Sequence, residues 1–183
     1  MKFKTVDCII KDGSKVRIRE AMPKDAQELI KCISSYILQS DNLISTIEEF
    51  NPTLYQQEDW INLLTRRENS ILLVAEYNGK IIGNVDLKGE SRKRISHNAL
   101  LGIGILKGWQ QLGLGTALLR NVIDWARNNV AIENIGLNVF EGHSQAIYLY
   151  EKAGFQKVGI QSNYIRKDDG TYANNIMMQI CVK

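Results

Sequence analysis

The segment spanning residues 99–125, ALLGIGILKGWQQLGLGTALLRNVIDW, changes its hydrophobic pattern at its centre. Its first eight residues are apolar or glycine, as in a buried strand, whereas Leu114, Leu118 and Val122 recur at helical spacing. Glycines crowd the junction, since five of the chain's 14 glycines lie between positions 102 and 115. At a helix N-terminus, glycines leave backbone N–H groups open to a ligand, and the helix dipole favours an anion there. The segment therefore predicts a strand, a phosphate-binding turn and a helix.

Two common phosphate-binding motifs fit this turn poorly. A P-loop requires Lys and then Ser or Thr directly after its second glycine, but Leu114 and Gly115 follow Gly113 here. Nucleotide binding through a P-loop is therefore excluded. A dinucleotide-binding fingerprint belongs at the first strand-to-helix turn of a parallel unit, whereas this turn follows strands that we expect to be antiparallel. Dinucleotide binding is the weaker alternative.

The rest of the chain predicts strands and helices in an order typical of an α+β domain. Asn78-Gly79 between two apolar runs is a strong hairpin signal, and Gly154 stands where it would end a short helix. The expected strands span residues 16–19, 71–77, 80–87, 95–106, 135–140, 155–165 and 175–182, and the expected helices lie near 26–37, 60–64, 114–128 and 144–153. No repeat or linker interrupts them, so we expect a single domain over residues 1–183 with its core at about 15–182.

Composition excludes several classes of protein. With 183 residues, of which 44% are hydrophobic and 23% charged, the chain can bury a core and lacks the signature of disorder. A net charge of +3 is too small to indicate a nucleic-acid-binding domain. The longest apolar or glycine run, residues 99–106, is too short to span a bilayer. We therefore expect neither a nucleic-acid partner nor a membrane.

The cysteines and histidines give no sign of a metal or disulfide framework. Cys8, Cys32 and Cys181 are odd in number and far apart, and the chain has only two histidines. We expect no bound metal. The first residues contain no apolar run of signal-peptide length, so a reducing, cytoplasmic setting is expected.

Two motifs resemble those of one enzyme family. Residues 110–115, QQLGLG, resemble the Gln/Arg-x-x-Gly-x-Gly/Ala pyrophosphate loop of the GCN5-related N-acetyltransferase (GNAT) superfamily. Residues 137–155 resemble the second motif of that family, which ends in Leu-Tyr-x-x-x-Gly-Phe. The resemblance covers about residues 15–182 in matching element order. It implies a mixed, mostly antiparallel, splayed sheet of about six or seven strands flanked by about four helices.

The resemblance also implies where acetyl-CoA binds. It places the cofactor between the strand near 97–106 and the strand near 135–140, with the pantetheine paired to the strand edge at 103–105 and the pyrophosphate on 110–115. Gly102 and Gly104 would then reflect close approach of the cofactor or a bulge, or else a kinked strand with no ligand. The predicted cofactor-binding residues are Ile103, Gly104, Ile105, Gln110, Gln111, Leu112, Gly113, Leu114, Gly115, Thr116, Asn138, His143 and Ser144.

The second motif departs from the usual family pattern at one position. Where the family commonly has Asn-x-x-Ala, this chain has His143, two further residues and then Ala146. Either His143 donates to the cofactor, or His143 or Ser144 caps the following helix. Asn138 would contact the pantetheine arm or would simply be a solvated residue of an edge strand.

The resemblance suggests Tyr150 as the general acid that protonates the CoA sulfur, the alternative being a core tyrosine. Tyr148, two residues away, is expected to pack. A backbone N–H near Ile103 is expected to polarise the thioester carbonyl. The candidates for the general base are Glu20, Glu76, Asp86 and His97, and none of them stands out. Asp86 and His97 either face each other across the hairpin, or His97 is simply exposed beside the basic turn.

The acceptor side is expected at two loops, residues 40–53 and 168–173. Asp41, Glu48 and Glu49 make the first loop acidic, which suits a cationic amine, although loop charge is ordinarily solvated. Residues 168–178 resemble those of polyamine and ribosomal-protein N-terminal acetyltransferases, but Asn174 and Asn175 replace the acidic residues of that pattern.

These observations predict an N-acetyltransferase that moves an acetyl group from acetyl-CoA to a primary amine of a small molecule or peptide. Direct transfer in a ternary complex is expected, because no Cys lies near either motif. A non-catalytic acyl-CoA-binding module and a nucleotide-binding protein are the alternatives. The sequence leaves the oligomeric state open, a homodimer included.

Overall fold

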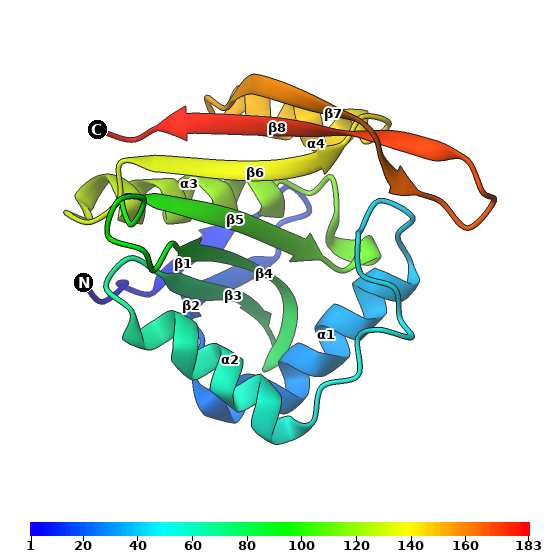
Figure 1. The fold of residues 1–183 in the computed structure, drawn as a ribbon. Coiled ribbons are helices and arrows are strands. Elements are labelled where there is room, and N and C mark those ends of the chain that lie inside the picture. Colours follow the sequence, from blue (N-terminus) through cyan, green and yellow to red (C-terminus); the bar gives the residue numbers. More distant parts are fainter.

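An eight-stranded sheet runs through the computed structural model, which describes residues 1–183 (Figure 1). Its strand order is β1-β2-β3-β4-β5-β6-β8-β7, and every neighbouring pair is antiparallel except β5 and β6. The strands are β1 Val6–Ile9, β2 Lys15–Glu20, β3 Ile71–Tyr77, β4 Lys80–Gly89, β5 Asn98–Ile105, β6 Asn134–Phe140, β7 Gln156–Arg166 and β8 Tyr172–Cys181. The predicted α+β class is confirmed. The predicted number of strands is too small by at least one, because β1 is a short edge strand with mostly exposed side chains and no apolar alternation.

Four helices cover the two faces of the sheet. Helices α1 Ala26–Leu38 and α2 Leu54–Arg66 pack on one face, and α3 Leu114–Asn128 and α4 Ser144–Lys152 pack on the other. Strand β3 shows why both faces need cover, since Leu72 and Val74 point to α1 and α2 while Leu73 points to α3. Two short 3-10 turns, Pro23–Asp25 and Lys107–Trp109, precede α1 and α3. None of the helices has the length and apolar character needed to cross a membrane.

Local turn chemistry agrees with the sequence-based expectations. Asn78 and Gly79 join β3 to β4 with left-handed φ angles of 47° and 76°, as a tight hairpin requires. Gly154 follows α4 with φ of 100°, so it ends that helix as predicted. Thr53 and Gln56 form a reciprocal capping box at the start of α2.

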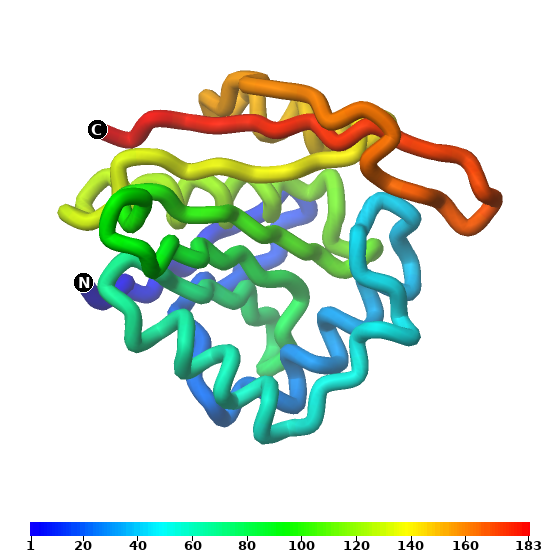
Figure 2. Tube along the Cα trace, viewed as in Figure 1, coloured from blue at the N-terminus to red at the C-terminus, as the bar shows by residue number.

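Strands β5 and β6 diverge along their length. They pair only through Asn98–Leu100 of β5, opposite Asn134–Gly136 of β6. Beyond that point β5 stays with β4 as far as Ile105, and β6 stays with β8 as far as Phe140. Figure 2 shows the green β5 segment and the yellow β6 segment separating. The predicted splayed sheet is confirmed.

A partly buried ion cluster fixes the start of α1 on the sheet. Arg19 of β2 donates to both carboxylate oxygens of Asp25, at 2.6 and 2.9 Å, and to Glu76 at 2.8 Å. Asp25 also accepts the Met22 N–H at 2.7 Å. Burial alone would raise the pKa of Asp25, but these hydrogen bonds outweigh it and hold the pKa below its usual value. Helix α1 is thereby positioned to bring Tyr36 to the pocket described next.

Candidate active site

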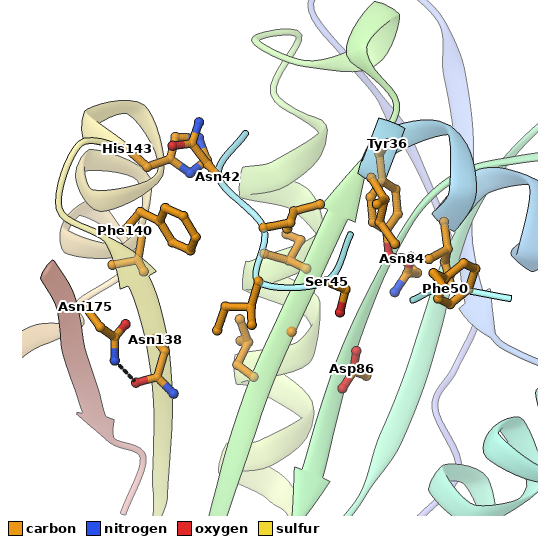
Figure 3. Close-up of a pocket in the computed structure, with 18 of the residues that line it drawn as sticks. Tyr36, Asn42, Ser45, Phe50, Asn84, Asp86, Asn138, Phe140, His143 and Asn175 are labelled. Atoms are coloured by element: carbon orange, nitrogen blue, oxygen red, sulfur yellow. Dashed lines mark hydrogen bonds between the residues drawn. The ribbon is translucent and has the colours of Figure 1, made fainter. Parts of the chain in front are cut away.

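A pocket of about 370 Å³ lies at the opening between β5 and β6. Asp86 and Asn84 of β4 lie on one side of it with Tyr36 of α1, and residues of β6 and β8 lie on the other side (Figure 3). The loop between α1 and α2 contributes residues 42–45, and α4 contributes Tyr150. The pocket therefore joins helices and strands from both halves of the splayed sheet.

The turn before α3 presents a row of free backbone donors. None of the N–H groups of residues 111–116 donates a hydrogen bond within the chain. Gln111 and Gly113 adopt left-handed φ angles of 61° and 90°, which curl the turn into the N-terminus of α3. The structure thus brings together all seven predicted residues of this turn, Gln110, Gln111, Leu112, Gly113, Leu114, Gly115 and Thr116. Such a cradle suits a phosphate group.

Three contacts hold this turn against the sheet. The Trp109 ring packs against Tyr77 with 4.7 Å between centroids. The Gln110 side chain donates to the Ile105 carbonyl at 3.0 Å, and the Leu112 carbonyl accepts the Lys11 N–H at 2.9 Å. The last contact brings a lysine beside Gly113. Sequence reasoning missed Lys11, because no pattern in residues 6–9 signals the strand that carries it there.

The β5 edge offers backbone groups to the opening at alternate residues. The Asn98 carbonyl and the Leu106 N–H both bond to the β4 side, so even-numbered residues between them face β4. Ile103 and Ile105 consequently direct their N–H and C=O groups toward the opening, whereas those of Gly104 face β4. Of the three predicted strand residues, Ile103 presents both backbone groups to a ligand. Ile105 presents only its N–H, because its carbonyl accepts the Gln110 side chain.

Gly102 and Gly104 make room for protein side chains. A Cβ on Gly102 would come within 2.9 Å of an Asp86 carboxylate oxygen, and a Cβ on Gly104 would collide with the Tyr36 ring. The register between β4 and β5 is continuous over this stretch, so the bulge, one of the explanations for these glycines, is not present. The close approach that these glycines permit is that of Tyr36 and Asp86.

Asp86 is the one carboxylate of the pocket lining. Burial raises its pKa to about 7, although Lys88 partly offsets this effect. No protein group donates a hydrogen bond to it, and cross-strand pairing with Gly102 directs it to the face of the sheet that α1 covers. Asp86 therefore changes charge near neutral pH beside the opening.

The other three candidate bases lie elsewhere. Glu76 is paired with Arg19, and Glu20 accepts the Phe3 N–H. His97 precedes β5 and is not in the pocket lining, whereas Asp86 pairs with Gly102 further along that strand. Asp86 and His97 therefore do not face each other, and the first of the two alternatives for His97 is wrong.

Tyr150 belongs to both the core and the pocket. Its side chain is 8% exposed and its ring packs edge-on against Phe155 with 5.9 Å between centroids. The hydroxyl has no hydrogen-bond partner in the protein, and burial raises the pKa of Tyr150 to about 12. The phenol is thus protonated at neutral pH and able to donate. Tyr148, by contrast, is 65% exposed, so its expected packing is wrong.

The second predicted motif reaches the pocket through two of its three polar residues. His143 and Asn138 line it, and burial lowers the pKa of His143. Ser144 is exposed at the first position of α4. Neither His143 nor Ser144 makes a side-chain capping bond, so helix capping by them is not observed.

The expected acceptor loops contribute unequally. Residues 42–45 and Phe50 line the pocket, while the acidic residues Asp41, Glu48 and Glu49 are exposed outside it. The turn at 168–173 contributes no lining residue. Its predicted place at the pocket is wrong, because the β7–β8 hairpin carries that turn past the opening. Asn175, further along β8, lines the pocket instead.

Comparison with known proteins identifies the family. The model of the acetyltransferase (GNAT) family matches residues 36–155, which include the turn before α3 and Tyr150. The chain belongs to the GNAT family. A crystal structure of a GNAT acetyltransferase from Streptococcus pneumoniae superposes with a TM-score of 0.88 at 32% identity, covering 91% of this chain and 99% of that one.

Curated relatives of this GNAT chain are N-acetyltransferases. The L-amino acid N-acetyltransferase AaaT of Escherichia coli is 29% identical over 90% of this chain and 97% of its own. An N-alpha-acetyltransferase of Sulfurisphaera tokodaii is 26% identical over 88% of this chain and 93% of its own. A Salmonella typhimurium acetyltransferase solved with acetyl-CoA shares the fold, with a TM-score of 0.81 at 18% identity over 92% of this chain and 94% of its own. The predicted family, fold and activity, an acetyl-CoA-dependent N-acetyltransferase, are confirmed.

The raised pKa of Asp86 predicts a pH-dependent stability. The folded chain holds this proton up to about pH 7 and the unfolded chain releases it near 4, so the free energy of unfolding falls as pH rises between these values. Asp86→Asn removes the effect and should gain about 1–2 kcal/mol over wild type between pH 5 and pH 8, a value reduced for partial solvent access. Urea unfolding at both pH values measures this gain.

Asp41→Asn removes one exposed carboxylate and serves as the control. Equal pH dependence in wild type and Asp86→Asn would show that Asp86 titrates as an ordinary surface carboxylate.

Proposed function

We propose that this protein acetylates the primary amine of a small molecule or peptide by direct transfer from acetyl-CoA within a ternary complex. The observation that carries the proposal is the continuity of two unpaired backbone surfaces. The β5 edge, unpaired at both backbone groups of Ile103 and at the N–H of Ile105, leads to the free N–H groups of residues 111–116. An extended amide-containing arm followed by a pyrophosphate is complementary to that sequence of surfaces.

The residues present suit acetyl-CoA chemically. The cradle at 110–116 would hold the pyrophosphate, and Lys11 beside Gly113 would neutralise part of its charge. The pantetheine arm would pair with the Ile103 carbonyl and the Ile105 N–H, which leaves the Ile103 N–H for the thioester carbonyl. His143 faces the same opening as a neutral side chain, able to donate one hydrogen bond.

Asp86 acts as the general base and Tyr150 as the general acid. Asp86, ionised above about pH 7, accepts a proton from the incoming ammonium, directly or through water. The neutral amine then forms the N–C bond while the C–S bond breaks. Tyr150 donates its proton to the leaving sulfur, and the N–H of Ile103 stabilises the developing charge on the carbonyl oxygen. The amine nitrogen loses two protons in total: Asp86 releases the first to solvent, and the second restores the phenol of Tyr150. The net products are the amide, the CoA thiol and one proton.

The non-catalytic alternative needs only the cradle. An acyl-CoA-binding module has no use for a titratable carboxylate and an unpartnered phenol in one pocket, and this chain has both. The unpaired cysteines support a reducing, cytoplasmic compartment. Relatives suggest two acceptors, free L-amino acids and protein α-amines.

An amine panel tests the activity. Acetyl-CoA and each of several amines (amino acids, amino-acid amides, peptides, polyamines and aminoglycosides) are incubated with the protein, and CoA thiol release is measured. At least one class should raise thiol release above that with acetyl-CoA alone. Tight acetyl-CoA binding with no release for any amine would favour the non-catalytic module.

Replacing Gly113 should abolish acetyl-CoA binding. Gly113→Val puts a β-branched side chain at φ of 90° in the cradle, which displaces several donors at once. Calorimetry should show Kd raised at least about 100-fold, since a hydrogen bond to a charged group contributes about 1.5–3 kcal/mol.

Two control glycines separate binding from folding. Gly79→Val imposes the same strain at φ of 76° in the hairpin turn, and Gly108→Ala adds a methyl group in open space near the cradle. Both should bind acetyl-CoA as wild type does. Equal loss in Gly79→Val and Gly113→Val would assign the effect to unfolding and leave the cradle without support.

Two conservative variants separate proton transfer from binding. Tyr150→Phe and Asp86→Asn should each lower kcat by about 100-fold while the Kd of acetyl-CoA stays unchanged. For wild type, kcat/KM should rise with pH through about 7, and Asp86→Asn should lose that rise. Wild-type kcat in Tyr150→Phe at every pH would make Tyr150 a packing residue only.

A further inference from the structure

The side-chain amide of Asn175 has one polar atom without a partner. Asn175 is 2% exposed and lines the pocket. Its Nδ2 donates to Asn138 Oδ1 at 3.0 Å and to Gln161 Oε1 at 2.7 Å. Its Oδ1 is buried and accepts nothing. A buried acceptor in this state is costly unless a bound molecule supplies the donor.

The sheet holds this amide in place. Asn175 of β8 lies opposite Phe140 of β6 and Gln161 of β7, so three side-chain amides cross three strands on one face. With both hydrogens of Nδ2 engaged, Oδ1 is the atom left for a ligand. Figure 3 shows the bond from Asn175 to Asn138 beside the opening.

Asn138 completes a matched pair. Its Oδ1 is engaged by Asn175, while its Nδ2 has no partner in the protein and its side chain is exposed. The pair thus leaves one C=O acceptor and one N–H donor unpaired at its two ends (Figure 3). A trans secondary amide, whose N–H and C=O point in opposite directions, has the complementary groups.

The charges in the pocket also favour a neutral amide over a carboxylate. No Lys or Arg lines it, its one carboxylate is Asp86, and burial favours neutral His143. A substrate carboxylate would find no cation to pair with, and burying an unpaired charge is strongly unfavourable. An amide has no such charge.

Resting on the proposed function, we infer that the acceptor is an α-amine adjoining a secondary amide, such as a peptide N-terminus or an amino-acid amide. Asn175 accepts the amide N–H, Asn138 donates to the amide C=O, and Asp86 faces the amine. Free amino acids, which have a carboxylate at that position, are poor acceptors.

The pantetheine arm of CoA also contains secondary amides. The place of Asn175 and Asn138 in the sheet shows whether they face an amide of the acceptor or an amide of pantetheine. The pantetheine has its own backbone partners at the β5 edge, whereas Asn175 lies on β8, beyond β6. Strand register also puts Asn138 on the same face of the sheet as Gly102 and its partner Asp86. The pair therefore lies on the face where the amine must meet its base.

Three matched acceptors test the inference with the intact protein. Alanine N-methylamide offers the N–H and the C=O, alanine methyl ester offers only the C=O, and alanine carries a carboxylate. We expect kcat/KM for the amide to exceed that for the ester by about tenfold, and that for the free acid by more. Equal or better use of the free acid would overturn the inference.

Two variants test Asn175 and Asn138 separately. Asn175→Leu should lower kcat/KM for the amide about tenfold and leave kcat/KM for the ester unchanged. Asn138→Ala alters an exposed side chain, so the fold is retained, and it should lower kcat/KM for the amide and for the ester by the same factor. Gln179→Leu removes an exposed amide of β8 outside the pocket, and it should change kcat/KM for neither acceptor.

Acetyl-CoA affinity, measured by calorimetry, distinguishes the two sources of amide. An unchanged Kd in Asn175→Leu and Asn138→Ala supports acceptor recognition. A tenfold weaker Kd with an unaltered amide-to-ester ratio would assign the pair to pantetheine and overturn the inference. Acetylation of other amines without an amide preference would overturn it and leave the proposed function standing, while no acetylation of any amine would overturn both.

Discussion

The shortness of the pairing between β5 and β6 is the constraint on which the rest of the site depends. Because the two strands share only the pairs from Asn98 to Leu100, the sheet has an unpaired edge in its interior. That edge leaves both backbone groups of Ile103 and the N–H of Ile105 unpaired, and it ends at the turn whose N–H groups are free. A continuous ladder would satisfy the same groups internally and leave no place for an extended ligand.

The opening is also where the two faces of the sheet meet. Asp86 belongs to the face that α1 and α2 cover, and Tyr150 comes from a helix on the opposite face. In an intact sheet these groups would be separated by a layer of backbone. Divergence of β5 and β6 lets one pocket contain both the carboxylate and the phenol. The glycines of β5 contribute by leaving space for Asp86 and Tyr36.

Local patterns in the sequence predict the elements well and the contacts between them poorly. Helical spacing gives α3 its bounds of Leu114–Asn128, and Asn78-Gly79 marks the hairpin, because both signals depend on neighbouring residues. The purpose of Gly104 depends on Tyr36, which lies far away in the chain, and the raised pKa of Asp86 depends on burial by several elements. The free oxygen of Asn175 is equally invisible in sequence, since it follows from hydrogen bonds across three strands.

An incomplete sheet couples the folding of this protein to the supply of its cosubstrate. A ligand that occupies the β5–β6 opening binds the folded chain and not the unfolded one, so by mass action it adds RT ln(1 + [L]/Kd) to the free energy of unfolding. This amounts to about 2.7 kcal/mol at a hundredfold excess over Kd. The cradle and the strand edge contact parts that acetyl-CoA shares with free CoA, so loss of both forms would shorten the lifetime of the chain against proteolysis.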